Sequence, residues 1–219
     1  MITRNYKIGF IVLTILFAIA NTVDAQNSGI EEMIKSRAAH KVGLLGEYIG
    51  TIADKSQGDL RTRLHFCDKA LSLFIGKGGP YEEDGVERKG VVMEVTSVNR
   101  KNADGSPYVN RRLMKNYFNG LANLRYDAVS IETTDVADIK VSNLHRVADN
   151  LFVCTCFFEQ AFTGYKDGRP VYKDITRKAV KCYVIQDEIE PELIEEGGDR
   201  YEYLVLLGDV RAIDTVRVK

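Results

Sequence analysis

Apolar residues recur every three or four positions in the first half of the chain, and this spacing predicts three helices. The first is expected over about 29–56. The second is expected over about 60–75, with Asp59 as its N-cap. The third is expected over about 107–124, because Ser106 and the proline after it suit an N-cap and a first helical position.

After the third helix the pattern changes to the alternation that is typical of strands. One further strand, at 91–98, is expected before that helix. The later strands are expected at 126–133, 137–147, 151–165, 170–186 and 201–217. Helices that are segregated from strands along a chain indicate an α+β fold, in which the helices cover the apolar face of the sheet.

Two cysteines stand two positions apart in the apolar stretch LFVCTCFFEQ, and alternation places both on one strand face. The turn that follows decides which residues they oppose. A three-residue loop at 166–168 places Cys154 opposite Val180 and collects the apolar side chains of both strands on one face. A two-residue turn places Cys154 opposite Lys181. We favour the three-residue loop, because it separates apolar from polar side chains more cleanly.

The four cysteines allow three interpretations. They can be passive core thiols, since an unpaired cysteine behaves as a small buried hydrophobe, and we favour this one. They can form one disulfide, in which Cys67 on the second helix pairs with Cys154, Cys156 or Cys182. They can form a zinc or redox site, but the spacing is not C-x2-C, so no metal site is expected.

The N-terminus has the features of a secretory signal peptide, with a basic start, an apolar run over 9–20 and small residues before Gln26. We therefore predict a signal peptide at 1–25, a single mature domain at 26–219 and a periplasmic or secreted location. The alternative is an uncleaved membrane anchor. The run is shorter than the ~20 residues of a spanning helix, so no membrane span is expected after cleavage.

Composition and net charge limit the number of domains and the classes of partner. The chain has 219 residues, 45% of them hydrophobic, which is enough for one well-buried domain. The formal net charge is -1, so nothing general indicates nucleic acid or an anionic membrane surface as a partner.

The order of elements resembles the nuclear transport factor 2-like superfamily, whose cystatin-like cone wraps a curved antiparallel sheet around N-terminal helices. The matching segments are KSQGDLRTRL, VVMEVTSV, RRLMKNYFNGLANL and FVCTCFFEQAFTGYKDGRPVYKDITRKAVKCYV. The resemblance is to small exported bacterial members. It implies an α+β domain with three helices in its N-terminal half, packed on a curved antiparallel sheet of about five or six strands.

The superfamily includes isomerases and dehydratases that use a pocket inside the cone. A site of that kind needs a buried carboxylate beside a donor such as tyrosine. Asp174 and Glu159 lie near a hairpin end, so we expect both to be exposed, and no catalytic residue is assigned. The expected pocket residues are Tyr48, Phe74, Tyr117, Phe152 and Phe158.

The sequence thus favours an exported, non-catalytic domain that binds a small apolar ligand or a protein partner, with a homodimer through the sheet as one such partner. A cone-pocket isomerase or dehydratase is the alternative. No cofactor is expected.

Overall fold

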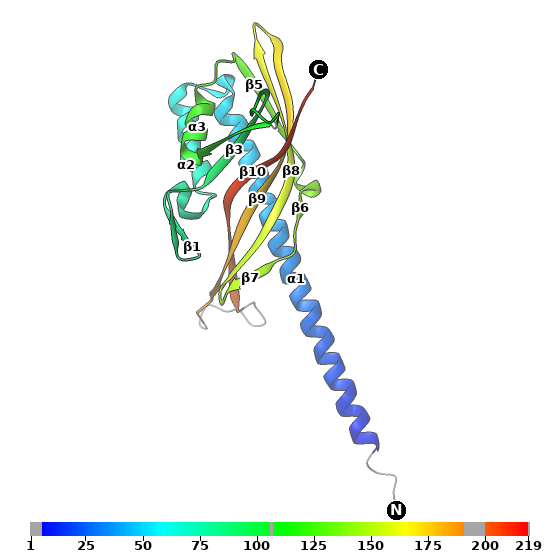
Figure 1. Cartoon of the computed structure of the whole chain (residues 1–219). Helices are drawn as coiled ribbons and strands as arrows, with labels where there is room; N and C mark the ends of the chain where they lie inside the picture. Colours follow the sequence, from blue (N-terminus) through cyan, green and yellow to red (C-terminus); the bar gives the residue numbers. More distant parts are fainter. Residues whose placement is uncertain (1–5, 106, 191–199, 219) are drawn as a thin grey trace, which may run out of the picture. The chain divides into compact units, whose positions relative to one another are not determined.

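The computed structural model describes residues 6–105, 107–190 and 200–218 (Figure 1). It divides into two compact units, Met1–Ser36 and Arg37–Lys219. The first unit, as far as it is described, is the N-terminal part of helix α1 (Tyr6–Ala53). In the described residues we find no helix with an apolar stretch long enough to cross a membrane. Residues 1–5 of the predicted signal peptide lie outside the described residues, and its cleavage stays a prediction.

The second unit carries the rest of α1 and two shorter helices, α2 (Leu60–Leu71) and α3 (Met114–Ala122). Asp59 is the N-cap of α2, as predicted: its carboxylate accepts a 2.7 Å hydrogen bond from the Thr62 N–H group. Short 3-10 turns are η1 (Lys55–Gln57), η2 (Ile75–Gly78) and η3 (Val136–Asp138).

The predicted start of the third helix is wrong. The segment Pro107–Leu113 is a strand, β4, that pairs antiparallel with β3 (Val92–Lys101), and α3 begins only after it. Cross-strand pairing therefore prevails over a local proline signal that fits a helix start and an edge strand equally well. Ser106, the predicted N-cap, lies outside the described residues.

The fold is α+β, as predicted, with helices packed against one large sheet. The strand order is β4-β3-β10-β9-β8-β5, and β6 and β7 also pair with β8. The remaining bounds are β1 (Tyr81–Glu83), β2 (Val86–Arg88), β5 (Ala128–Thr133), β6 (Lys140–Val141), β7 (His145–Ala148), β8 (Leu151–Lys166), β9 (Arg169–Glu188) and β10 (Tyr201–Arg217). Strands β1 and β2 form a separate hairpin.

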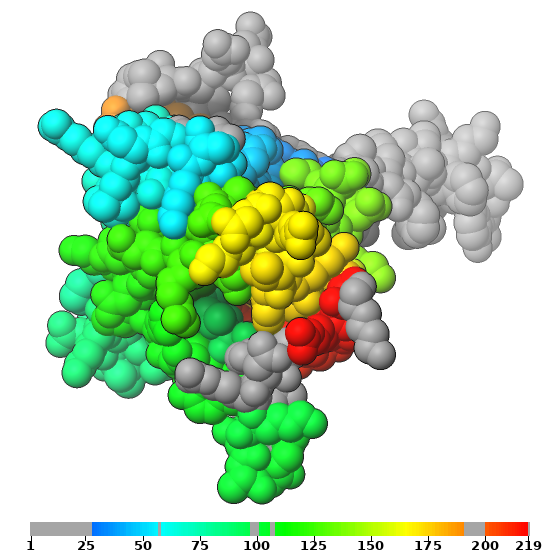
Figure 2. Space-filling view, turned by 90° about the horizontal axis from the view of Figure 1, so that it is seen from above, coloured from blue at the N-terminus to red at the C-terminus, as the bar shows by residue number. Residues whose placement is uncertain are grey.

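The sheet differs from the expected one in two respects. Within the described residues it has eight strands instead of five or six, because β4 replaces part of a helix and the expected strand 137–147 is split into β6 and β7. It is mixed instead of purely antiparallel, because β10 runs parallel to β3. Figure 2 shows the hairpin end of β8 and β9 in yellow, beside green parts of the chain. Strand β5 is the antiparallel partner of β8.

The hairpin of β8 and β9 corrects the predicted turn. Asp167 and Gly168 both have positive φ, and Lys166 opposes Arg169, so the turn has two residues. A register shift between Gly164 and Tyr165 then moves the pairing by one position, and Cys154 opposes Cys182 instead of Val180 or Lys181. The apolar face that was predicted is nevertheless present, because a net shift of two positions keeps every side chain on its side.

Two features hold the helices in place. Helix α1 passes so close to the end of β5 that a Cβ atom on Gly46 would lie 2.5 Å from Thr133 Oγ1, so only glycine fits there. Arg63 of α2 is buried, and its Nη1 donates hydrogen bonds to the carbonyl oxygens of Ile52 (3.0 Å) and Ala122 (2.9 Å). These carbonyls belong to the C-terminal ends of α1 and α3, where the helix dipole favours a cation.

Candidate functional site

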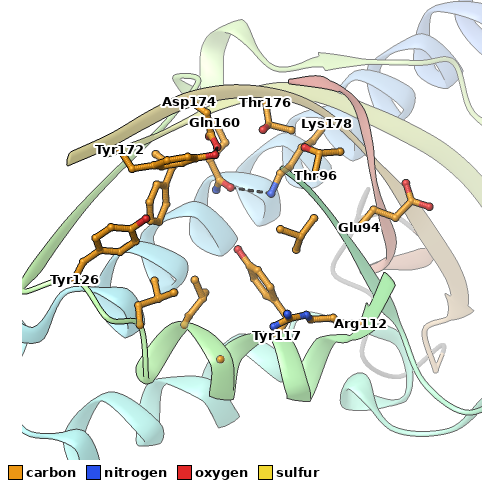
Figure 3. A pocket seen from close by; sticks show the side chains of 15 residues that line it. Glu94, Thr96, Arg112, Tyr117, Tyr126, Gln160, Tyr172, Asp174, Thr176 and Lys178 are labelled. Atoms are coloured by element: carbon orange, nitrogen blue, oxygen red, sulfur yellow. Dashed lines mark hydrogen bonds between the residues drawn. The ribbon is translucent and has the colours of Figure 1, made fainter. Parts of the chain in front are cut away.

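A cavity of about 290 Å³ opens between α3 and the inner face of β3, β8 and β9 (Figure 3). Its volume is close to the lower end of the range of about 300–1,000 Å³ that ligand pockets cover. It is lined by Glu94, Val95, Thr96, Arg112, Tyr117, Gly120, Leu121, Leu124, Tyr126, Gln160, Phe162, Tyr172, Asp174, Thr176 and Lys178.

Strand β9 supplies the polar wall of this cavity. Asp174, Thr176 and Lys178 occupy alternate positions, so they share one strand face, and all three are buried. The same face continues into the apolar core with Val180 and Cys182. One face of one strand therefore changes from polar, at the cavity, to apolar, beneath the rest of the sheet.

Lys178 and Gln160 form the polar centre of the site. Lys178 Nζ donates a 2.8 Å hydrogen bond to Gln160 Oε1, and each residue is 6% exposed. Burial lowers the pKa of Lys178 to about 8, although the charge of Asp174 acts in the opposite direction. Gln160 Nε2 is buried and has no hydrogen-bond partner in the described part of the chain. A buried donor without a partner is costly, so the amide nitrogen of Gln160 is available to donate a hydrogen bond.

Asp174 and Tyr172 form a second polar pair on the same strand. The Tyr172 hydroxyl donates a hydrogen bond to Asp174 Oδ2. Burial raises the pKa of Asp174, while this hydrogen bond and the charge of Lys178 lower it. The pKa of Tyr172 is raised, by burial first and then by its bond to Asp174. The pair thus combines a carboxyl group that is less acidic than usual with a phenol that keeps its proton.

Tyr117 enters the cavity from α3, on the opposite side from β9. Its side chain is buried, and Figure 3 shows its hydroxyl pointing toward the hydrogen bond between Lys178 and Gln160. Burial raises the pKa of this phenol above its ordinary value, so the hydroxyl is a hydrogen-bond donor at neutral pH.

The cavity also has an aromatic wall and a basic rim. The ring centroids of Tyr126 and Phe162 lie 5.7 Å apart, and those of Phe162 and Tyr172 lie 5.8 Å apart, which suits an apolar ligand body. Arg112, on β4, is exposed at the rim. Glu94 beside it is engaged elsewhere, because its carboxylate pairs with Arg111 and accepts a hydrogen bond from the Ala212 N–H group.

Of the five predicted pocket residues, only Tyr117 lines this cavity. Tyr48 is half-buried near Phe66, with ring centroids 6.3 Å apart, and Phe74 packs in the core. Phe152 lies under the Arg146 guanidinium, at 5.9 Å from its ring centroid. Phe74 thus fills the core, while Tyr48 and Phe152 are half-buried away from the cavity.

The remaining predicted residue, Phe158, borders a shallower polar depression whose other lining residues include Phe157, Glu159 and Arg177. It is buried, while Phe157 and Glu159, on the outer face of the same strand, are exposed. Phe158 shares the inner face of β8 with Gln160 but is not among the residues that line the cavity between α3 and β9.

The expectation that Asp174 is exposed is wrong, since only 8% of it is accessible. Glu159 is exposed as expected. The difference is strand parity: Asp174 and Lys178 lie an even number of positions from Val180, on the face already assigned to the core, whereas Glu159 lies on the other face of β8. Extending the alternation from Val180 back to Tyr172 in the sequence would have identified the polar wall.

The cysteines lie apart from the cavity. All four are buried thiols, and the strand cysteines contact one another, with Cys156 Sγ 3.6 Å from Cys182 Sγ. Cys67 Sγ instead lies 3.8 Å from the Arg63 carbonyl oxygen. A disulfide from Cys67 to a strand cysteine stays a prediction. The described residues contain no group of three or more His, Cys, Asp or Glu side chains placed to hold a metal ion.

Three comparisons with known proteins were made. No family model matches the chain, and no curated protein matches it. A crystal structure of a putative scytalone dehydratase from Novosphingobium aromaticivorans is similar, with 10% sequence identity, a TM-score of 0.38, and coverage of 87% of this chain and 92% of that chain. A likeness of this degree assigns neither an activity nor a ligand.

Proposed function

We propose that the cavity between α3 and β9 binds a small organic molecule that carries a carbonyl or hydroxyl oxygen on an apolar body. The observation that carries this proposal is that Gln160 lines the cavity and that its Nε2, buried in the cavity wall, has no hydrogen-bond partner within the described residues. A ligand oxygen that accepts from this group would satisfy it. The aromatic wall of Tyr126 and Phe162 would receive the apolar body.

This ligand is more polar than the sequence suggested. Buried groups such as Lys178 and Thr176 are expensive to desolvate, and a site for a purely apolar molecule has no use for them. Specific ligand pockets combine mostly apolar walls with a few placed polar groups, and the cavity has this composition.

A second candidate is proton-transfer chemistry in the same cavity, and the Asp174–Tyr172 pair favours it. The raised pKa of Asp174 makes its carboxylate a stronger base than that of an ordinary aspartate, and the Tyr117 hydroxyl, whose pKa is also raised, keeps its proton and can donate a hydrogen bond to a substrate oxygen. This arrangement supports an isomerase or dehydratase type of reaction within a nuclear transport factor 2-like fold. The binding function does not depend on it.

We further propose that the chain acts after export, in the periplasm or outside the cell. The support is the basic start, the apolar run over 9–20 and the small residues before Gln26.

Binding can be tested by NMR with small alcohols and ketones such as benzyl alcohol and acetophenone. We expect their chemical-shift changes in the ¹⁵N spectrum to cluster on β8, β9 and α3. In Gly120→Leu the new side chain fills the cavity from α3, where only the flexible end of Arg112 has to move, at 3.3 Å from the new Cβ. Binding should be lost in this variant.

The matched control is Asn119→Leu, one position earlier on α3, which is exposed and does not line the cavity. It should bind as the wild type does. Equal binding by the wild type and Gly120→Leu, or shifts scattered over the surface, would reject the cavity as the binding site.

A further inference from the structure

Lys178 differs from an ordinary surface lysine in all of its contacts. Its amine contacts the amide oxygen of Gln160 at 2.8 Å and the sulfur of Met93 at 3.8 Å, and it forms no ion pair within the described part of the chain. Lys181, three positions later, points to the other face. Its amine donates a 2.7 Å hydrogen bond to the Glu83 carboxylate and lies over the Tyr183 ring.

This difference has a chemical consequence. An amine next to a carboxylate keeps its proton and is not a nucleophile. An amine that is desolvated and whose direct contacts are neutral loses its proton more easily, even with the charge of Asp174 acting against this, and roughly one tenth of such groups with a pKa near 8 are uncharged at pH 7. Lys178 lines the cavity, so a molecule bound there meets this amine directly.

We propose that Lys178 captures an aldehyde or ketone in the cavity as a covalent imine. The inference rests on the binding function proposed above and specifies its ligand class: a carbonyl compound with a small, largely aromatic or aliphatic body.

The reaction needs no oxidant, reductant or cofactor. The lone pair of Lys178 Nζ attacks the carbonyl carbon, a C–N bond forms, and the carbonyl oxygen takes up a proton to become a hydroxyl group. The nitrogen gives up one proton to form the neutral carbinolamine, the hydroxyl group takes up a second proton and leaves as water, and the resulting iminium nitrogen releases its remaining proton to leave a C=N bond. One water molecule is released for each imine formed, and hydrolysis reverses the reaction.

The groups around Lys178 are placed to assist these reaction steps. Tyr117 points its hydroxyl toward the amine from the opposite wall (Figure 3), and its raised pKa keeps it a donor for the oxygen of the tetrahedral intermediate. Gln160 binds the amine through its oxygen, and its unpartnered Nε2 is buried in the wall of the same cavity. The aromatic rings of Phe162 and Tyr172 can hold the ligand body.

The test is reductive trapping with benzaldehyde. The purified protein is incubated with benzaldehyde and sodium cyanoborohydride, which converts an imine into a stable benzylamine, and the modified lysines are identified by peptide mass spectrometry. We expect Lys178 to be modified first, several-fold faster than Lys181, with a rate that rises as the pH passes from 7 to 9.

Two variants and one inert ligand sharpen this test. Lys178→Met should lose the fast modification, and Lys181→Met should keep it. Benzyl alcohol cannot form an imine but fits the same space, so it should compete with benzaldehyde for Lys178. Slow or absent modification of Lys178 in the wild type overturns the imine inference.

The same data separate this inference from the binding function. If benzyl alcohol binds in the cavity by NMR while Lys178 remains unmodified, only the imine inference fails. If benzyl alcohol does not bind and Lys178 is unmodified, both fail.

Discussion

Lys178 Nζ donates a 2.8 Å hydrogen bond to Gln160 Oε1 at a position where both side chains are almost fully buried. The pair joins β9 to β8 inside a cavity. An amide can bind an ammonium group but cannot neutralise it, so the protein bears the cost of burying a charge there.

This cost predicts a pH dependence of stability. The pKa of Lys178 is lowered from 10.5 to about 8, so between these values the unfolded chain binds a proton that the folded chain does not. Stability therefore rises with pH in this window and carries the full penalty below it. Between pH 7 and 9.5 we expect a gain of about 2 kcal/mol in the free energy of unfolding from this group.

Urea denaturation at the two pH values measures this gain as the difference between the wild type and Lys178→Met. Taking the difference removes the contributions of other titrating groups. An identical pH dependence in the two proteins would show that Lys178 is not desolvated.

Tyr172→Phe tests the second polar pair. The Tyr172 hydrogen bond holds the pKa of Asp174 below the value that burial alone would give, so its removal should raise the pKa of Asp174 further. The carboxyl ¹³C resonance of Asp174, followed against pH, reports this change. Tyr201→Phe, on an exposed position of β10, should leave the titration of Asp174 as it is in the wild type.

The core could be predicted from the sequence better than the site could. The apolar face of β8 and β9 was recognised because Cys154, Cys156 and Val180 alternate with polar residues. Its register was not, because the glycine at position 164 was not read as a bulge, and that bulge shifts the pairing after the turn. Every apolar residue stayed on its predicted face, since a shift of two positions keeps parity.

The site was missed for a related reason. A buried polar residue resembles an exposed one in composition, so Asp174 was assigned to the solvent side, and Lys178 was not considered, because their parity was not followed. Arg63 was missed as a core residue in the same way. Hydrogen bonds to the carbonyl oxygens of Ile52 and Ala122, which are distant in sequence, offset the cost of burying the Arg63 guanidinium. No local sequence pattern reveals such partners.

Arg63→Met should destabilise the protein by about 2–4 kcal/mol, because two buried carbonyl oxygens at helix ends lose their donor. Arg61→Met, on the exposed side of α2, should change the free energy of unfolding by less than about 0.5 kcal/mol. Thermal denaturation of both variants measures the contrast, and equal effects would contradict the role of Arg63 as a clamp between helices.

The cysteines should be unreactive in the folded protein. Burial raises the pKa of Cys67, and hydrogen bonds with Cys154 and Cys156, together with burial, raise that of Cys182. Reaction with Ellman's reagent should be slow in native buffer and should reveal four thiols per chain after unfolding without reductant. A count of two would instead indicate a disulfide, and peptide mapping would show whether Cys67 takes part in it.

The most direct measurement of the site is the titration of Lys178 itself. Its ε-methylene resonance, assigned by its absence in Lys178→Met, can be followed by NMR from pH 6 to 11. We expect a pKa of about 8 in the wild type and a higher value in Gln160→Glu, where a carboxylate replaces the amide. A wild-type pKa near the ordinary 10.5, unchanged in Gln160→Glu, would contradict a desolvated polar pocket built around Lys178.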